Sequence, residues 1–249
     1  MKTYDKVLSQ LTTLNLKGIT KKLDEAVNEA ERGQFSYISF IDYLLQAELN
    51  FRIERRLQRN MTGAHFPVQK KIEDFEFGLI KGVSKMDISQ VLEFNWIDKH
   101  ENMLFFGPPG LGKTHLAISI GIKAVEKGYV VSFERMTALI KLLKTSDIQR
   151  SASFRLNRII KSDLIIIDEI GYSPIERKEA NLFFNLVSEL YEKKSIIITS
   201  NKNFSEWAEM MGDEIMTTAL LDRLLHHSKI FNLDGVSYRI KKIKKKEVK

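Results

Sequence analysis

The sequence contains no cysteine, which excludes disulfide bonds, thiolate metal sites and a cysteine nucleophile. Long apolar runs are also missing, since no stretch approaches the roughly 20 consecutive apolar residues that a membrane-spanning helix requires. No opening segment combines a charged start, an apolar centre and a small-residue cleavage site, so no secretory signal is predicted. We therefore expect a cytoplasmic protein with no membrane contact.

Charge and length further limit the class of protein and its partners. The 249 residues include 39 Lys and Arg against 32 Asp and Glu, which gives a formal net charge of +7. An excess of this sign favours polyanionic partners such as nucleic acid, although a soluble protein with a basic surface is the simpler alternative. The apolar content suffices for a packed core, and the length suits one large domain or an ordinary domain with a small one.

The most informative stretch is Gly107-Pro108-Pro109-Gly110-Leu111-Gly112-Lys113-Thr114, which fits the phosphate-loop pattern G-x-x-x-x-G-K-[ST]. Residues 102–106 before it have the length and bulk of a buried strand, and the residues from His115 onward open a helix. In this setting consecutive backbone N–H groups cradle nucleotide phosphates, Lys113 reaches the β and γ phosphates, and Thr114 ligates Mg²⁺. A purely structural glycine turn would explain neither the spacing nor the flanks. We predict an ATP and Mg²⁺ site whose nucleotide contacts are Gly107, Pro108, Pro109, Gly110, Leu111, Gly112, Lys113, Thr114 and His115.

Two acids, Asp168 and Glu169, follow the aliphatic run at residues 164–167. A continuous aliphatic strand is typical of a parallel sheet, whose carboxyl edge carries ligand-binding groups. Asp168 is predicted to hold Mg²⁺, and Glu169 to polarise the water that attacks the γ phosphate. The alternative is a turn at the end of a strand.

Asn201 follows a second such strand at residues 195–200. We predict that its side chain hydrogen-bonds the γ phosphate or positions the attacking water, although asparagine is also a common turn residue. Arg239, near the end of the chain, is a candidate for contact with the γ phosphate of its own subunit.

Arg223 lies on a predicted helix late in the chain. Its permanently charged, planar fork suits the stabilisation of transition-state charge on a phosphate bound by a neighbouring subunit. The alternative is an ion pair within the chain, with Asp222 or Glu214. His226 and His227 are expected to point in different directions on this helix, and no Cys or third His lies nearby, so we predict two surface residues rather than a metal site.

The chain is expected to have three parts. Residues 1–65 are predicted to be a small helical domain without a catalytic constellation, which needs docking on the rest of the chain, on another copy or on a partner. Residues 66–240 are the predicted nucleotide-binding domain, and 241–249 a basic tail that adds nonspecific affinity for nucleic acid. Two basic helical surfaces are either solvated or contacts for DNA phosphates: Arg52, Arg55, Arg56 and Arg59 in the first domain, and Arg150, Arg155 and Arg158 in the second.

The segments before and after the loop are also interpreted. Phe75 and Phe77, just upstream of the nucleotide-binding motifs, either contact adenine or lie on a short strand that buries both rings. Residues 85–100 and 136–145 are predicted to be helices, and residues 128–133 a strand.

These motifs resemble those of AAA+ ATPases. The residues within them are similar to those of the IstB branch, which is close to the DnaC-type helicase loaders. The resemblance covers roughly residues 63–240 and is carried by residues 105–117, 168–172, 199–201, 222–228 and 237–239. It implies an α/β fold, with a P-loop AAA+ three-layer αβα domain and a parallel sheet, preceded by a small all-helical domain and lacking a separate helical lid. Leu190 departs from the pattern, because relatives often have arginine there, and no arginine role is carried over to it.

The resemblance also implies a function and residue roles. The implied protein is an ATP-dependent helper of an insertion-sequence transposase, which binds DNA, duplex in preference to single strands, forms a homo-oligomer through its ATP sites and presents target DNA to the transposase. By this resemblance, Lys113 and Thr114 bind phosphate and Mg²⁺, and Asp168 and Glu169 form the second nucleotide motif. Asn201 would be sensor 1 and Arg239 sensor 2. Arg223 would be the finger that acts on the site of a neighbouring subunit.

Three alternative functions stay open. A replicative helicase loader of the DnaC type has the same nucleotide chemistry and differs in its partner, which the first 60 residues do not reveal. A small-molecule P-loop kinase is disfavoured by Glu169, by Asn201 and by the basic tail. An ATP-gated DNA scaffold with negligible turnover is disfavoured by the presence of Glu169.

Overall fold

A computed structural model describes residues 3–33 and 35–238 and divides the chain into two compact units, Met1–Arg59 and Asn60–Lys249. The first unit contains α1 (Thr3–Thr13), α2 (Lys17–Glu31) and most of α3 (Tyr37–Ala64), which continues into the second unit. The expected helical start is therefore present. Across the described part of the chain, no helix has both the length and the apolar character needed to cross a membrane. The predicted basic tail at 241–249 lies outside the described residues.

Glu48 joins α2 to α3 within the first unit. Its buried carboxylate accepts hydrogen bonds from the backbone N–H groups of Gly18 (2.7 Å) and Ile19 (3.3 Å) in the first turn of α2. The Nε of Arg52, one turn along α3, is a third donor at 2.7 Å. Burial opposes ionisation, but Arg52 and the two N–H donors outweigh it and lower the pKa of the Glu48 carboxyl. A buried, ionised carboxylate thus caps one helix from the next.

Glu48→Ala is expected to lower the free energy of unfolding of the first unit by about 1–3 kcal/mol, because the N–H groups at the start of α2 lose their acceptor. Since the pKa of the folded state lies below the ordinary value, the stabilisation is complete above the ordinary glutamate pKa and is lost as the pH falls through the folded-state pKa. Urea unfolding followed by circular dichroism, at neutral and at acidic pH, measures both effects. Glu54→Ala, at an exposed position of the same helix, is the control, and an equal loss in both variants would contradict the assignment.

The second unit is built on a five-stranded sheet and a two-stranded ribbon. Its strands are β1 (Ile80–Lys81), β2 (Asn102–Phe106), β3 (Val131–Arg135), β4 (Leu164–Ile170), β5 (Ser195–Ser200), β6 (Ser228–Asn232) and β7 (Asp234–Gly235). Its helices are α4 (Lys85–Val91), α5 (Asn95–Asp98), α6 (Lys113–Lys127), α7 (Met136–Thr145), α8 (Arg150–Lys161), α9 (Arg177–Leu190), α10 (Phe204–Met211) and α11 (Glu214–Leu225), with short 3₁₀ turns η1 (Ile72–Asp74) and η2 (Phe77–Leu79).

The strand order of the large sheet is β3-β4-β5-β2-β6, and all neighbouring strands are parallel. Consequently every strand ends at one edge, here called the carboxyl edge, and begins at the opposite amino edge. The ribbon pairs β1 antiparallel to β7. β5 lies between β2 and β4, so the segments that follow these three strands are neighbours at the carboxyl edge.

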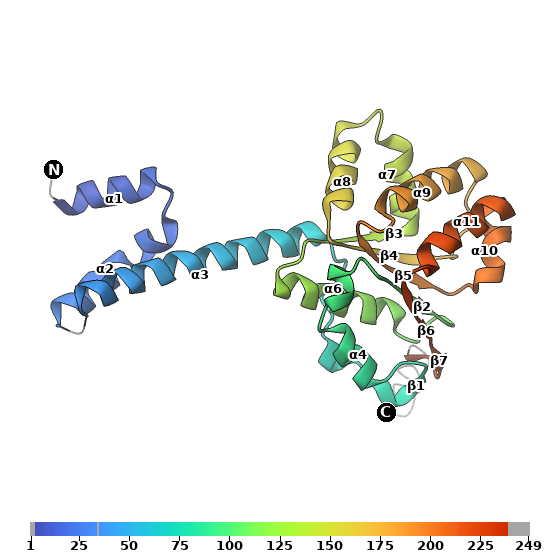
Figure 1. Cartoon of the computed structure of the whole chain (residues 1–249), viewed down its shortest axis with the longest axis horizontal. Helices are drawn as coiled ribbons and strands as arrows, with labels where there is room; N and C mark the ends of the chain where they lie inside the picture. Colours follow the sequence, from blue (N-terminus) through green and yellow to red (C-terminus); the bar gives the residue numbers. More distant parts are fainter. Residues whose placement is uncertain (1–2, 34, 239–249) are drawn as a thin grey trace, which may run out of the picture. The chain divides into compact units, whose positions relative to one another are not determined.

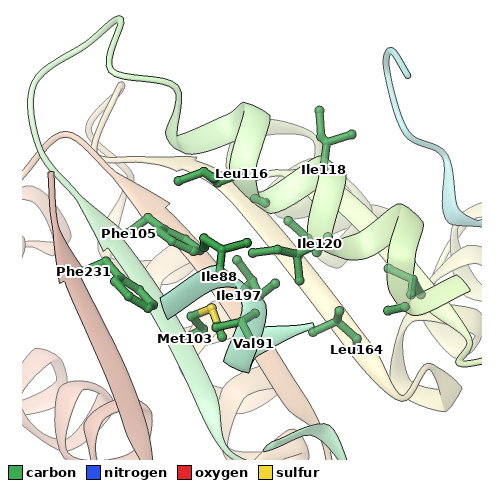
Figure 2. Packing of buried hydrophobic residues seen from close by; sticks show 14 of the residues in the cluster. Ile88, Val91, Met103, Phe105, Leu116, Ile118, Ile120, Leu164, Ile197 and Phe231 are labelled. Carbon is green, nitrogen blue, oxygen red and sulfur yellow. The ribbon is translucent and has the colours of Figure 1, made fainter. Parts of the chain in front are cut away.

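Helices cover both faces of the sheet, as Figure 1 shows. Alternate residues of a strand face opposite sides, so Met103 and Phe105 of β2 pack with Leu116 of α6 in the cluster of Figure 2. Leu104 of β2 belongs instead to a second cluster, which includes residues of α7, α9, α10 and α11. Burial on both faces explains the continuous aliphatic runs. The predicted three-layer αβα arrangement with a parallel sheet is confirmed.

The single helix predicted for residues 85–100 is wrong. Two helices, α4 and α5, occupy this range, and Phe94 between them has a φ of 64°. This left-handed conformation is incompatible with a continuous helix, and it places the Phe94 ring in the core with 2% of its surface exposed. The short strand, one of the two alternatives for Phe75 and Phe77, is also absent from the described residues, where η1 ends at Asp74 and η2 begins at Phe77. The burial that this alternative included is present, because Phe75 lies in the first core cluster and Phe77 packs against it.

Arg155 lies neither on a solvated surface nor on a surface free to contact DNA. Its Nε donates to Oε1 of Glu134 (2.6 Å) and its Nη1 to the backbone carbonyl of Gly63 (3.1 Å). The two side chains of the ion pair are only 12% and 10% exposed, and burial raises the pKa of the Glu134 carboxyl even though Arg155 opposes the shift. Arg155 is therefore structural, whereas Arg150 on the same helix is exposed.

Candidate nucleotide-binding site

The phosphate loop connects the end of β2 to the first turn of α6, at the carboxyl edge. Gly112, which precedes α6, has a φ of 89°, and a Cβ at this position would lie 2.6 Å from the ring of Phe75. Gly107 has a φ of 137°, and a Cβ there would lie 2.1 Å from the carbonyl oxygen of Leu233. Conformation and lack of space both require glycine at these two positions. The loop is thus held between two neighbouring segments, with the N-terminus of a 15-residue helix directed at it.

Lys113 is the first residue of α6, and its side chain turns back over the loop. Its Nζ donates to the carbonyl oxygens of Gly107 (2.6 Å) and Pro108 (2.9 Å). The residue is buried, so the ammonium group is held inside the loop rather than in solvent. A short movement of this flexible side chain would exchange carbonyl oxygens for phosphate oxygens, which form stronger, charge-assisted hydrogen bonds.

Asp168 is the centre of a buried hydrogen-bond network. Its Oδ1 accepts from Oγ1 of Thr114 (2.8 Å) and from Oγ1 of Thr199 in β5 (2.5 Å). Its Oδ2 is also buried and has no hydrogen-bond partner in the part of the chain that the structure describes. A buried carboxylate oxygen without a partner is costly unless a ligand satisfies it. Thr114, which donates its proton to Asp168, keeps its lone pairs available, so the two oxygens together fit a hard cation such as Mg²⁺.

Glu169 differs from Asp168 in that its side chain is 43% exposed. Its φ of 63° is unusual for a residue other than glycine, and its N–H donates to Oγ1 of Thr199 (3.0 Å). The regular pairing of β4 with β5 shifts between Ile167 and Ile170, which accommodates this conformation. The carboxylate of Glu169 lies 3.7 Å from Nε of Arg135, the last residue of β3. The carboxyl edge therefore presents one acid held in the sheet and one directed outward.

Asn201 follows β5 directly and lies beside the segment that follows Glu169. A Cβ at Gly171 would stand 3.3 Å from Oδ1 of Asn201. Asn201 therefore lies at the same edge as the two acids, and its partly exposed side chain is accessible there.

Tyr238 fastens the last described segment to the phosphate loop. Its backbone N–H donates to the carbonyl of Gly110 (3.0 Å), and its hydroxyl accepts from the backbone N–H of Glu76 (3.0 Å). Arg239, predicted to reach the γ phosphate, lies outside the described residues.

Arg223 lies at the amino edge, away from the loop of its own chain. The carbonyl of the next residue, Leu224, accepts from the side-chain Nδ2 of Asn102, the first residue of β2 (3.1 Å). The phosphate loop begins only after the last residue of β2, which is about 13 Å further along the strand at roughly 3.3 Å per residue. The structure therefore separates Arg223 from the other predicted site residues that it describes.

The guanidinium of Arg223 is held by neutral groups. Its Nη1 donates to the carbonyl of Ala219 (2.8 Å), and its carbon lies 4.9 Å from the centre of the Phe184 ring. An ion pair with Asp222 or Glu214 is not found within the described residues, so that alternative is wrong. In the part of the chain that the structure describes, the positive charge of Arg223 has no carboxylate partner.

His115 contacts the chain rather than standing free beside the loop. Its Nε2 lies 2.7 Å from the carbonyl of Lys71, and its ring meets Phe75 edge-on at 5.5 Å. A nucleotide contact by His115 remains a prediction. Leu190, where the resemblance led us to expect arginine, is 1% exposed in the second core cluster.

Two residues of the site were missed in the sequence. Thr199 lies in the motif at residues 199–201 but was assigned no role of its own, and it connects Asp168 to the backbone of Glu169. Arg135 was overlooked because the strand was expected to end at residue 133, whereas β3 extends to 135 and pairs Arg135 with Asp168.

The fold and the site together define a P-loop protein of the AAA+ class. The phosphate loop, the paired acids and Asn201 follow β2, β4 and β5 at one edge of a five-stranded parallel sheet, with α6 pointing at the loop.

The chain belongs to the family of IstB-like ATP-binding proteins, whose model matches residues 9–246. It is 38% identical over 235 residues to a protein of Pseudomonas aeruginosa named as a putative ATP-binding protein of insertion sequence IS21, and the matched region covers 94% of this chain and 89% of the relative. It is 39% identical over 236 residues to the corresponding protein of insertion sequence IS5376 from Geobacillus stearothermophilus, and the matched region covers 95% of this chain and 94% of the relative. The predicted family is confirmed.

Solved structures show the same fold at low sequence identity. The chain is similar to DnaI (TM-score 0.56, 15% identity, 67% of this chain and 92% of that one) and to the DnaC helicase loader (TM-score 0.51, 18% identity, 71% and 99%). It is also similar to AMPPCP-bound DnaA from Aquifex aeolicus (TM-score 0.53, 21% identity, 71% of this chain and 54% of that one).

Proposed function

We propose that this protein is a Mg²⁺-dependent ATPase that assembles on target DNA and assists the transposase of an insertion sequence. The observation that supports the proposal most strongly is the division of the site between two edges of the sheet. The loop, Asp168 and Glu169 lie together at the carboxyl edge, whereas Arg223 lies at the amino edge. A site of this kind is completed when the amino edge of one subunit meets the carboxyl edge of the next.

Hydrolysis follows from the roles of this chain's own residues. Lys113 and the backbone N–H groups of the loop bind and orient the phosphates, while Thr114 and Asp168 hold the metal. Mg²⁺, when bound, neutralises charge on the phosphate oxygens. Glu169 accepts a proton from the attacking water as the new bond to the γ phosphorus forms and the bond to the bridging oxygen breaks, which releases ADP and phosphate.

Three other residues complete the proposed site. Asn201 positions the water or reports the γ phosphate. Arg239 contacts the γ phosphate in the same subunit, and the hydrogen bond of Tyr238 to Gly110 supports this placement by fixing the preceding residue at the loop. Arg223 of the neighbouring subunit stabilises the negative charge that develops during transfer.

The partner is proposed to be a transposase because the relatives that match nearly the whole chain are named as proteins of insertion sequences. DNA, duplex in preference to single strands, is the second proposed partner, with the net charge of +7 in support. The helical first part of the chain, residues 1–65, is proposed to carry oligomer, DNA or partner contacts. The resemblance to the DnaC helicase loader keeps a helicase-loading function as the second candidate.

An in vitro insertion assay tests the proposal. We expect the purified chain with ATP to stimulate insertion of the element's ends into a plasmid by the transposase of the same element, and to sediment with that transposase on duplex DNA. Absence of stimulation, together with ATP-dependent binding to a replicative helicase and single-stranded DNA, would favour the helicase loader instead.

A further inference from the structure

Two neighbouring histidines and a glutamate meet at the amino edge of the sheet. Glu192 lies in the connection between α9 and β5, whereas His226 and His227 lie in the connection between α11 and β6. Because β5 and β6 both flank β2 and run parallel to it, these two connections lie at the same edge. The prediction that the two histidines point in different directions on a helix is wrong. They occupy a turn, and their ring centres are 4.0 Å apart.

The three side chains converge on one point. Nδ1 of His226 lies 3.7 Å from Oε1 of Glu192, and Nε2 of His227 lies 3.9 Å from the same oxygen. One ligand atom from each residue falls within 4.8 Å of the other two. Tetrahedral zinc, with bonds of roughly 2.0–2.1 Å, requires its ligand atoms to be about 3.4 Å apart. Side-chain rotations that move the ligand atoms by a few tenths of an ångström to about 1 Å would therefore bring all three within bonding distance of one ion.

The backbone that carries these ligands is fixed. Asn102 uses its side-chain amide to donate to the carbonyl of Leu224 (3.1 Å) and to accept from the N–H of Ile196 (3.0 Å). Its backbone N–H donates to the carbonyl of His227 (2.7 Å). One buried asparagine thus anchors the start of β5 and both sides of the turn that bears the histidines.

The hydroxyl of Tyr191 also contacts the cluster. It lies 2.7 Å from Nδ1 of His226. A ring nitrogen has one lone pair, so Nδ1 of His226 binds either this hydroxyl or an ion, and the Tyr191 hydroxyl turns away when Nδ1 is a ligand.

We propose that Glu192, His226 and His227 form a surface site for a divalent transition-metal ion, with zinc the ion whose chemistry fits best. Two imidazoles and one carboxylate are ligands that zinc accepts readily, whereas Mg²⁺ prefers oxygen alone. The three side chains are each about half exposed, at 52–56%, so an ion can enter and further positions remain open to water. The bound ion would tie the end of α9 to the end of α11. This inference does not depend on the proposed ATPase function.

The site escaped sequence analysis because no spacing connects Glu192 to a histidine pair 34 residues later in the chain. No Cys or third His lies close to the pair in the sequence. The topology of the sheet supplies the missing carboxylate.

Isothermal titration of the tag-free full chain with ZnCl₂ tests the proposal, in excess MgCl₂ so that oxygen-ligand sites are occupied. We expect one Zn²⁺ per chain. His227→Ala and Glu192→Gln should each lower the affinity by at least about a hundredfold, because each variant loses one of the three ligands. His100→Asn is the control, because His100 is exposed, has a φ of 58° that asparagine tolerates, and should leave binding unchanged.

Thermal unfolding gives a second measurement that does not rely on activity. Zn²⁺ should raise the melting temperature of the wild type and of His100→Asn but not of His227→Ala, and the melting temperatures without metal show whether each variant folds. Weak binding that all variants share, or no binding, would overturn the proposal and leave the cluster as a surface ion pair between Glu192 and protonated histidines.

Discussion

Glu169→Gln is expected to bind ATP as the wild type does, while its rate of ATP hydrolysis falls roughly 10²–10⁴-fold, the usual contribution of a general base. The amide has nearly the shape of the carboxylate but cannot accept the proton of the attacking water. The side chain is 43% exposed and its ion pair with Arg135 spans 3.7 Å, so the change should cost little stability. Binding of a fluorescent ATP analogue and release of phosphate, measured at the same protein concentration, separate the two effects.

Glu189→Gln is the matched control for this experiment, since Glu189 is an exposed residue of α9 and the chemical change is the same. It should hydrolyse ATP at the wild-type rate. If Glu169→Gln hydrolysed ATP as fast as the control, Glu169 would not be the base, and Asp168 and Asn201 would have to be reconsidered.

Arg223→Ala is expected to lower hydrolysis by the assembled protein roughly 10³–10⁵-fold, as the loss of an arginine finger does in other phosphoryl-transfer enzymes. Arg223 lies at the opposite edge of the sheet from the loop, so ATP binding by each subunit should be unchanged. Arg223→Lys should recover little, because a lysine lacks the planar fork. Arg177→Ala is the control: it removes an exposed arginine paired with Asp213 and should leave turnover near the wild-type rate.

Mixing two inactive variants tests whether Arg223 acts between subunits. Arg223→Ala keeps its own loop and acids, whereas Glu169→Gln keeps its arginine and binds ATP without hydrolysis. A mixed assembly would place the arginine of the second variant against the intact site of the first, so turnover should rise well above the sum of the separate variants. A mixture no more active than that sum would exclude action in trans.

The carboxyl edge was predictable because its chemistry is local in sequence. The phosphate loop, Asp168, Glu169 and Asn201 each follow an aliphatic strand directly, and parallel strands necessarily bring their ends together. The order of the strands, with β5 between β2 and β4, was not readable from these patterns. That order is what gives Thr199 its contacts with Asp168 and Glu169.

The features that were missed depend on tertiary contacts. Phe94 interrupts a region with helical periodicity because its ring is buried in a left-handed turn. Arg155 sits in a basic helix, yet a glutamate of β3 and the carbonyl of Gly63 hold it inside. Phe184, from another helix, lies against the guanidinium of Arg223, whereas the alternative interpretation placed Asp222 or Glu214 there. In each case the deciding neighbour is distant in sequence and belongs to another element.

The dependence of ATP hydrolysis on protein concentration tests the central claim, a site completed between subunits, most directly. The rate per subunit should be low in dilute protein, rise as assemblies form and rise further with long duplex DNA, in parallel with sedimentation of the chain into larger species. A rate per subunit that is constant from dilute to concentrated protein, and unaffected by DNA, would contradict the account, because each chain would then contain a complete site of its own.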